Sequence, residues 1–162
     1  MIEMTLSSIR VQMPDNVPVV LLKEVGSSGR TLPILIGHEE ATSIARAIQG
    51  IEPPRPLTHD LVRDILGALE VHLEAVVITE LRDAIFYAEL RMRRDSQPIV
   101  VSSRPSDAIA IAVRTGATIY ASEALLDSEA YVIQEDEEEE QEEVIEEFQK
   151  FIAQVRPEDF AS

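Results

Sequence analysis

The 162-residue sequence predicts an α+β or mixed α/β fold, in which a mixed β-sheet carries about three packed helices and is followed by a C-terminal amphipathic helix. Segments in which apolar residues recur at every second position are interspersed with segments of helical periodicity. Their order is strands, two helices, strands, a helix and a strand, without the strict alternation of a doubly wound sheet. A hydrophobic content of 45% suits a globular chain.

The first third of the chain predicts a β-hairpin, a third strand and a helix. Residues 5–12 and 17–25 are rich in β-branched and apolar side chains and flank a Pro-Asp-Asn turn. Residues 31–36 form the third expected strand. A helix is expected from residue 39 to residue 48, because two glutamates open it and a glycine follows it.

Residues 53–56 are a proline-rich linker that can itself be neither a helix nor a central strand. A second helix is expected after this linker. Thr58 is a suitable N-cap for this helix. Four apolar residues at helical spacing are expected on its buried side. These are Leu61, Ile65, Leu66 and Leu69.

The rest of the expected domain contains three strands, a third helix and a last strand. The strands are expected at residues 71–81, 85–92 and 98–101, where the apolar period returns to two. The helix at residues 105–114 is apolar on most sides, which predicts deep burial. Residues 118–121 form the last short strand.

Charge divides the chain into three expected parts. Residues 1–121 carry 12 basic and 15 acidic side chains, a formal charge of −3, whereas the remainder carries 2 and 15, a formal charge of −13. We expect a domain at residues 1–132 and a solvated acidic linker at residues 133–143. Residues 144–156 then show helical apolar spacing and predict an amphipathic helix whose apolar side needs a partner.

Composition excludes several functional classes. The chain has no cysteine, so disulfides, thiolate catalysis and cysteine-ligated zinc are excluded, and a cytoplasmic location is expected. No apolar run approaches the ~18 residues that span a bilayer, so no membrane association is expected. The first part of the chain also lacks an evident basic surface, which argues against tight nonspecific binding of nucleic acid.

Two similar segments contain the candidate functional residues. Residues 55–60 read Arg-Pro-Leu-Thr-His-Asp, and residues 104–107 read Arg-Pro-Ser-Asp. Proline suits the first helical position, so each segment holds an arginine and a carboxylate at the start of a helix, where anions are favoured. We take His59, Asp60 and Asp107 as candidate catalytic residues. The candidate substrate-binding residues are Arg55, Thr58, Arg104 and Ser106.

This residue set suits phosphodiester hydrolysis by two routes. If the two helix starts meet, Asp60 and Asp107 share a Mg²⁺ or Mn²⁺ ion, although no definite ligand set is evident. Without metal, His59 carries the proton and the arginines bind the phosphate. The competing interpretation is structural, because the aspartates can cap helices or pair with the same arginines.

Four blocks of the sequence, in this order, resemble the bifunctional nuclease domain family. They are residues 32–41, 54–60, 86–88 and 104–110. The resemblance extends over about residues 1–132 and implies activity on both RNA and DNA. Many members of that family continue into a short helical motif shared with excision-repair proteins, whereas this chain carries the acidic stretch.

These observations support two competing functions. The first is a nuclease that hydrolyses phosphodiester bonds in RNA and DNA with broad specificity, assisted by a divalent metal ion. The alternative is a non-catalytic interaction or regulatory module, a homo-oligomer with a dimer favoured, whose buried polar residues hold the assembly together and whose acidic tail docks a partner. In a third hypothesis the tail competes with nucleic acid for an arginine-lined groove.

Overall fold

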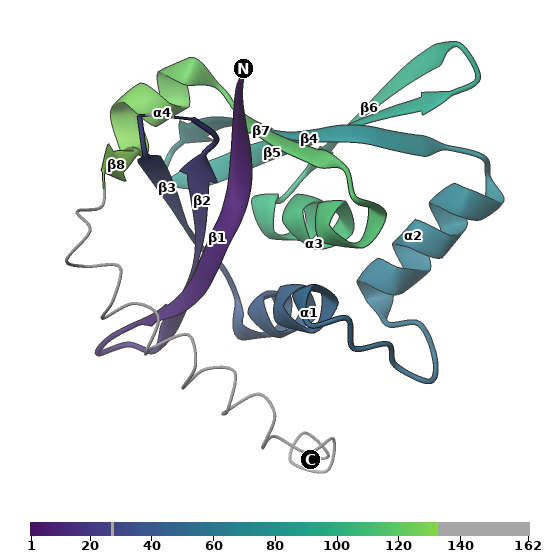
Figure 1. The fold of residues 1–162 in the computed structure, drawn as a ribbon, viewed down its shortest axis with the longest axis horizontal. Helices are drawn as coiled ribbons and strands as arrows, with labels where there is room; N and C mark the ends of the chain where they lie inside the picture. The colour runs from purple at the N-terminus through teal and green to yellow at the C-terminus, as the bar shows by residue number, and fades with distance from the viewer. Residues whose placement is uncertain (27, 133–162) are drawn as a thin grey trace.

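A single mixed β-sheet organises the computed structural model, which describes residues 1–26 and 28–132 (Figure 1). Its strand order is β6-β5-β4-β7-β1-β2-β3-β8. All neighbours are antiparallel except β4 and β7, which are parallel. The strands are β1 (Ile2–Gln12), β2 (Val17–Glu24), β3 (Arg30–Leu35), β4 (His72–Arg82), β5 (Ile85–Arg94), β6 (Gln97–Ser103), β7 (Thr118–Ala121) and β8 (Tyr131–Val132).

Four helices pack on this sheet within the described residues, which confirms the α+β class. Figure 1 shows α3 against the curved sheet, with α1 and α2 beside it and α4 near the end that holds β3 and β8. The helices are α1 (His38–Ile48), α2 (Thr58–Ala68), α3 (Pro105–Thr115) and α4 (Glu123–Glu129). The expected acidic linker and C-terminal helix, residues 133–143 and 144–156, lie outside the described residues.

Helix α3 is the centre of the core, as its all-round apolar sequence predicts. Its residues from Ala108 to Ala112 are all buried, and the small alanines let it contact α1, α2 and the strands β4, β5 and β7. Gly116 ends it in the left-handed conformation, with φ of 73°. This central position brings the start of α3 close to α1 and α2.

Helix α2 differs from its prediction in two respects. Leu57, in an extended conformation, is the N-cap, and Thr58 is the first helical residue. The second difference concerns burial: Leu61, Ile65 and Leu69 are 49%, 47% and 52% exposed, while Leu66 packs against the core only in part. Helix α2 makes few contacts with the sheet. The side opposite the exposed leucine and isoleucine side chains packs against α3.

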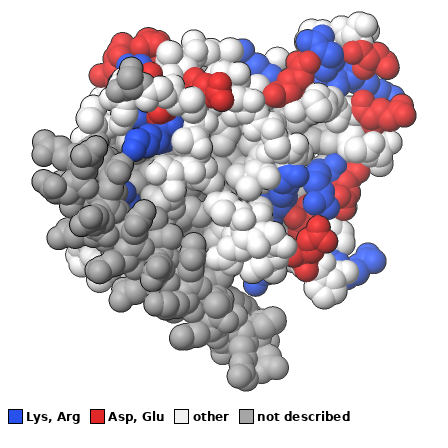
Figure 2. Space-filling model, viewed as in Figure 1, with Lys and Arg blue, Asp and Glu red and all other residues white. Residues whose placement is uncertain are grey.

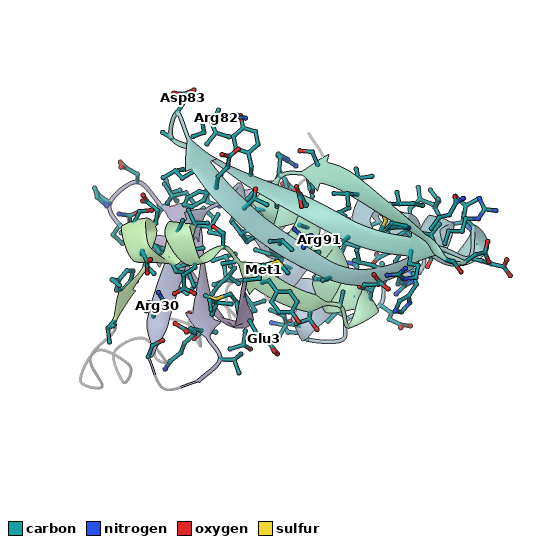
Figure 3. All side chains as sticks on the ribbon, turned by 90° about the horizontal axis from the view of Figure 1, so that it is seen from above. Met1, Glu3, Arg30, Arg82, Asp83 and Arg91 are labelled. Carbon is teal, nitrogen blue, oxygen red and sulfur yellow. The ribbon has the colours of Figure 1, made fainter. Side chains whose placement is uncertain are left out.

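The end of the domain contains a helix and a strand that the sequence did not suggest. Helix α4 begins where Ser122 accepts a hydrogen bond from the Leu125 N–H, at 3.2 Å, and β8 then pairs with β3. Arg30, labelled in Figure 3, ties α4 to the sheet: it reaches Glu24 at 2.7 Å, Asp127 at 2.8 Å and Glu123 at 3.0 Å. Residues 123–132 therefore pack as part of the folded domain.

Charges are mixed over the described surface. Figure 2 shows basic and acidic side chains intermingled on the visible face, without a continuous basic surface. The arginine-rich part of β5 shows why: Arg91 pairs with Glu89 at 3.2 Å, and Arg93 pairs with Glu74 at 2.5 Å. Arg91 also lies beside Met1 (Figure 3), its Nη1 3.3 Å from the sulfur. None of the helices in the described residues is long and apolar enough to cross a membrane.

Candidate functional site

Seven polar side chains link α1, α2 and α3 into one hydrogen-bonded group, called here the interhelix network. Two come from α1, two from α2, two from α3, and one is the N-cap of α3. They are Glu40, Ser43, His59, Asp60, Arg104, Asp107 and Arg114. With His59 neutral, three carboxylates and two guanidinium groups give this network a formal charge of −1.

His59 lies at the centre of the network, with both ring nitrogens engaged. Its Nε2 is 2.9 Å from Oδ1 of Asp107, and its Nδ1 is 2.8 Å from Oγ of Ser43. The side chain is only 13% exposed. A serine, a histidine and an aspartate from three different helices thus form a continuous hydrogen-bonded chain, which resembles in its order the triads of hydrolases.

Arg104 holds the other side of Asp107. Its Nε donates to Oδ2 at 2.8 Å and its Nη2 donates to Oδ1 at 3.1 Å, a two-pronged contact across the first turn of α3. Its Nη1 reaches Glu40 of α1 at 2.9 Å. The Arg104 side chain remains 65% exposed, so it can also contact a ligand from solvent.

Asp60 faces a different partner, Arg114, near the end of α3. Nε of Arg114 donates to Oδ1 of Asp60 at 2.6 Å, and the two side chains are 5% and 12% exposed. The other oxygen of Asp60 accepts the Leu57 N–H at 3.0 Å, which caps α2. Arg114 continues to Ser43, where Nη2 donates to both the carbonyl oxygen and Oγ at 3.1 Å.

Both aspartates have pKa values below the ordinary range. Burial acts to raise the pKa of Asp107, but hydrogen bonds from Arg104 and His59 and the charge of Arg104 outweigh it. Burial likewise acts to raise the pKa of Asp60, and the hydrogen bonds from Arg114 and the Leu57 N–H outweigh it. Both groups are therefore ionised at neutral pH and act only as hydrogen-bond acceptors.

A solvent-open hollow of about 840 Å³ lies over one side of the network. Its floor and walls come from α1 and from the starts of α2 and α3. Ser43, His59, Arg104 and Asp107 are all on its wall. The first turns of α2 and α3, which carry free backbone N–H groups and the positive helix ends, border the same space.

The structure brings together some of the sequence-predicted site residues and separates others. His59, Thr58, Arg104 and Asp107 line the hollow. Asp60 borders a second, smaller hollow of about 330 Å³. Ser106 is 6% exposed, and Arg55 is exposed in the α1–α2 linker but is not among the described residues that line the larger hollow.

A Mg²⁺ or Mn²⁺ ion shared by Asp60 and Asp107 does not fit this arrangement. Each carboxylate is already held by an arginine, and the two border different hollows. Within residues 1–26 and 28–132, no three histidine, aspartate or glutamate side chains form a group that could hold a metal ion. The groups assigned to the proposed reaction are therefore the side chains of the network.

Ser43, Glu40 and Arg114 were not recognised as site residues from the sequence. Ser43 is an ordinary position in the middle of α1, and Glu40 reads as a first-turn acid that suits the helix dipole. Arg114 is 71 residues from Ser43 along the chain. Only the packing of the three helices joins them, so no local motif signals these contacts.

Comparison with known proteins assigns the chain to a family. The family model described as the bifunctional nuclease domain matches residues 20–134. The chain belongs to the bifunctional nuclease domain family. All seven residues of the interhelix network fall inside the matched region, so the network belongs to the family domain and not to the acidic tail.

Relatives of this bifunctional nuclease domain occur in bacteria and plants. An uncharacterized protein of Mycobacterium tuberculosis is 46% identical over 163 residues, which cover 98% of this chain and 97% of that protein. Bifunctional nuclease 1 of Oryza sativa subsp. japonica is 27% identical over 64% of this chain and 33% of its own length. Bifunctional nuclease 2 of Arabidopsis thaliana is 26% identical over 72% and 37%. The domain thus matches about a third of each plant protein.

Proposed function

We propose that this protein is a nuclease that hydrolyses phosphodiester bonds in RNA and DNA with broad specificity. The observation that carries the proposal is the convergence of His59, Arg104 and Asp107 on one solvent-open hollow. These residues come from two segments that are far apart in the sequence. The names of the plant relatives, bifunctional nucleases, support the same activity.

Each residue has a defined task in this proposal. Arg104 moves part of its contact from Asp107 and Glu40 to a non-bridging phosphate oxygen, which its 65% exposure allows. The first turns of α2 and α3 add favourable backbone N–H groups. His59 accepts a proton from the attacking group, and ionised Asp107 stabilises the imidazolium that forms.

Broad specificity follows from the kind of contact. Arg104 and helix N-termini recognise phosphate, which is the same in every nucleotide and carries no base information. RNA and DNA are then both substrates, because no contact in this scheme requires the 2′-hydroxyl group. Binding is expected to weaken as the salt concentration rises, because it depends on contact between the charged Arg104 of the hollow and phosphate.

The test is cleavage of single-stranded RNA and DNA by the full chain, with Mg²⁺, with Mn²⁺ and with a chelator. His59→Ala is compared with His72→Ala, which removes an exposed histidine of β4. We expect His59→Ala to lose about 100-fold or more in kcat, as for loss of a general base, while His72→Ala keeps the wild-type rate. Equal rates in all three proteins would assign the cleavage to a contaminant and reject the proposal.

A second candidate function is a non-catalytic module that assembles with a second copy of the same chain. Two observations favour it: the charged groups of the network already pair with one another, and α2 exposes a row of leucine and isoleucine side chains. Leu57 and Leu61 of this row also line the larger hollow, so a dimer formed through them would border the proposed substrate site. Only an assembled protein without cleavage activity would favour the module over the nuclease.

A further inference from the structure

We infer that Ser43 is the nucleophile of the proposed reaction and forms a covalent bond to the phosphorus of the substrate. The inference rests on the proposed function and replaces a directly attacking water by a side chain. It starts from the hydrogen bonds around His59, whose two ring nitrogens are both occupied. Water can therefore reach a basic nitrogen of His59 only by displacing Ser43 or Asp107.

The tautomer of His59 follows from its partners. Asp107 is ionised and can only accept, so Nε2 of neutral His59 carries the hydrogen and Nδ1 is the basic atom. Ser43 Oγ already accepts a hydrogen from Nη2 of Arg114 at 3.1 Å, and its own hydrogen points to Nδ1 at 2.8 Å. The hydroxyl proton of Ser43 is thus the one that the base is placed to remove.

The surroundings of Ser43 suit an activated nucleophile. Loss of its proton leaves an alkoxide beside the guanidinium group of Arg114, which is 5% exposed and therefore little screened by water. Ser43 also lines the hollow that contains Arg104, so a phosphate bound there lies on the side from which Ser43 is reached. Helix α1 holds the serine on a rigid element.

The reaction proceeds in two displacements. In the first, Ser43 Oγ bonds to phosphorus as one phosphorus–oxygen bond to a nucleoside breaks; the Ser43 proton passes to Nδ1 of His59, and the departing oxygen takes a proton from solvent. In the second, water attacks the seryl phosphodiester and releases a proton to solvent, while Ser43 Oγ departs and recovers its proton from His59. The sum is hydrolysis of one bond by one water.

The deciding measurement is the stereochemical outcome at phosphorus with wild-type protein. A DNA oligonucleotide with a chiral phosphorothioate at the scissile position is cleaved in isotopically labelled water. DNA is used because it has no 2′-hydroxyl group that could attack phosphorus and also give retention. Each in-line displacement inverts phosphorus, so the two-step route gives net retention and direct attack by water gives inversion. Retention supports Ser43. Inversion overturns the Ser43 inference and leaves the proposed nuclease standing, whereas no cleavage of RNA or DNA overturns both.

A variant pair locates the covalent bond. Rapid acid quenching of wild-type protein with labelled oligonucleotide is expected to leave label on the peptide that contains Ser43. Ser43→Ala is expected to lose this label and more than about 100-fold in kcat, and Ser7→Ala, which removes an exposed serine of β1, keeps both. Label on another peptide, or full activity in Ser43→Ala, would overturn the assignment. Because retention is measured on wild-type protein, it is independent of how Ser43→Ala folds.

Discussion

The buried pair of Asp60 and Arg114 shows how a single residue can have a structural task beside a candidate active site. Asp60 looked like a catalytic carboxylate because it follows His59 in the sequence. In the structure it caps α2 and fixes Arg114, which in turn reaches Ser43. It borders the smaller hollow and not the larger one, so we expect it to act on the candidate site by positioning Arg114.

Removing Arg114 is expected to be costly for stability. Arg114→Met leaves the buried carboxylate of Asp60 without its charged partner, and the free energy of unfolding should fall by about 3–5 kcal/mol. Urea denaturation measures this change. Arg63→Met, which removes an exposed ion pair with Asp64, should cost no more than about 1 kcal/mol. Equal losses in the two variants would contradict the structural role of the Asp60–Arg114 pair.

The lowered pKa values of Asp60 and Asp107 predict acid sensitivity. The pKa of each is below the value of about 3.9 expected in the unfolded chain. Their ionised forms therefore stabilise the folded state fully above pH about 5, and this stability is lost as the pH falls through about 4 and below. As the pH is lowered from 7 to 3, the free energy of unfolding should fall less steeply in Asp107→Asn than in the wild type. An unchanged slope would contradict the prediction; exposed Asp95→Asn is the control.

Among the helices and strands, α2 is the element whose packing differs most from the sequence prediction. Its side chains at positions 57, 61, 65 and 69 share one face and are between 41% and 52% exposed. Periodicity alone predicted an apolar stripe, including Leu61, Ile65 and Leu69, but it could not say what the stripe packs against. The core-facing side is held instead by partly buried Val62 and Leu66 and by buried Asp60.

The exposed face of α2 predicts self-association. Burial of its leucine and isoleucine side chains against a second copy removes apolar surface from water, so a dimer is expected in sedimentation velocity experiments. Leu61→Glu should convert this dimer to a monomer. Ile85→Glu, which alters an exposed isoleucine of β5, should leave the dimer intact. A monomeric wild-type chain, or a Leu61→Glu dimer of unchanged affinity, would rule out this interface.

At the scale of the whole molecule, the sequence predicted the elements better than the contacts between them. The hairpin of β1 and β2 and the buried helix α3 with its Arg104-Pro105 start could be predicted because each has a local signal. The same signal was misleading at Arg55-Pro56, which precedes the Leu57 N-cap and lies outside α2. The partners of Ser43 and Arg114 could not be predicted, since they depend on how three helices cross. Helix α4 was missed because it is short and lies where the acidic composition begins.

The most direct test of the account is to map where a phosphodiester binds. A non-hydrolysable phosphonate dinucleotide, in which carbon replaces a bridging oxygen, is titrated into isotopically labelled protein, and backbone amide shifts are followed by NMR. We expect the largest shifts at residues 39–46, 57–61 and 104–107, around the larger hollow. Shifts concentrated instead at the arginines of residues 91–94, with none around the hollow, would contradict the account.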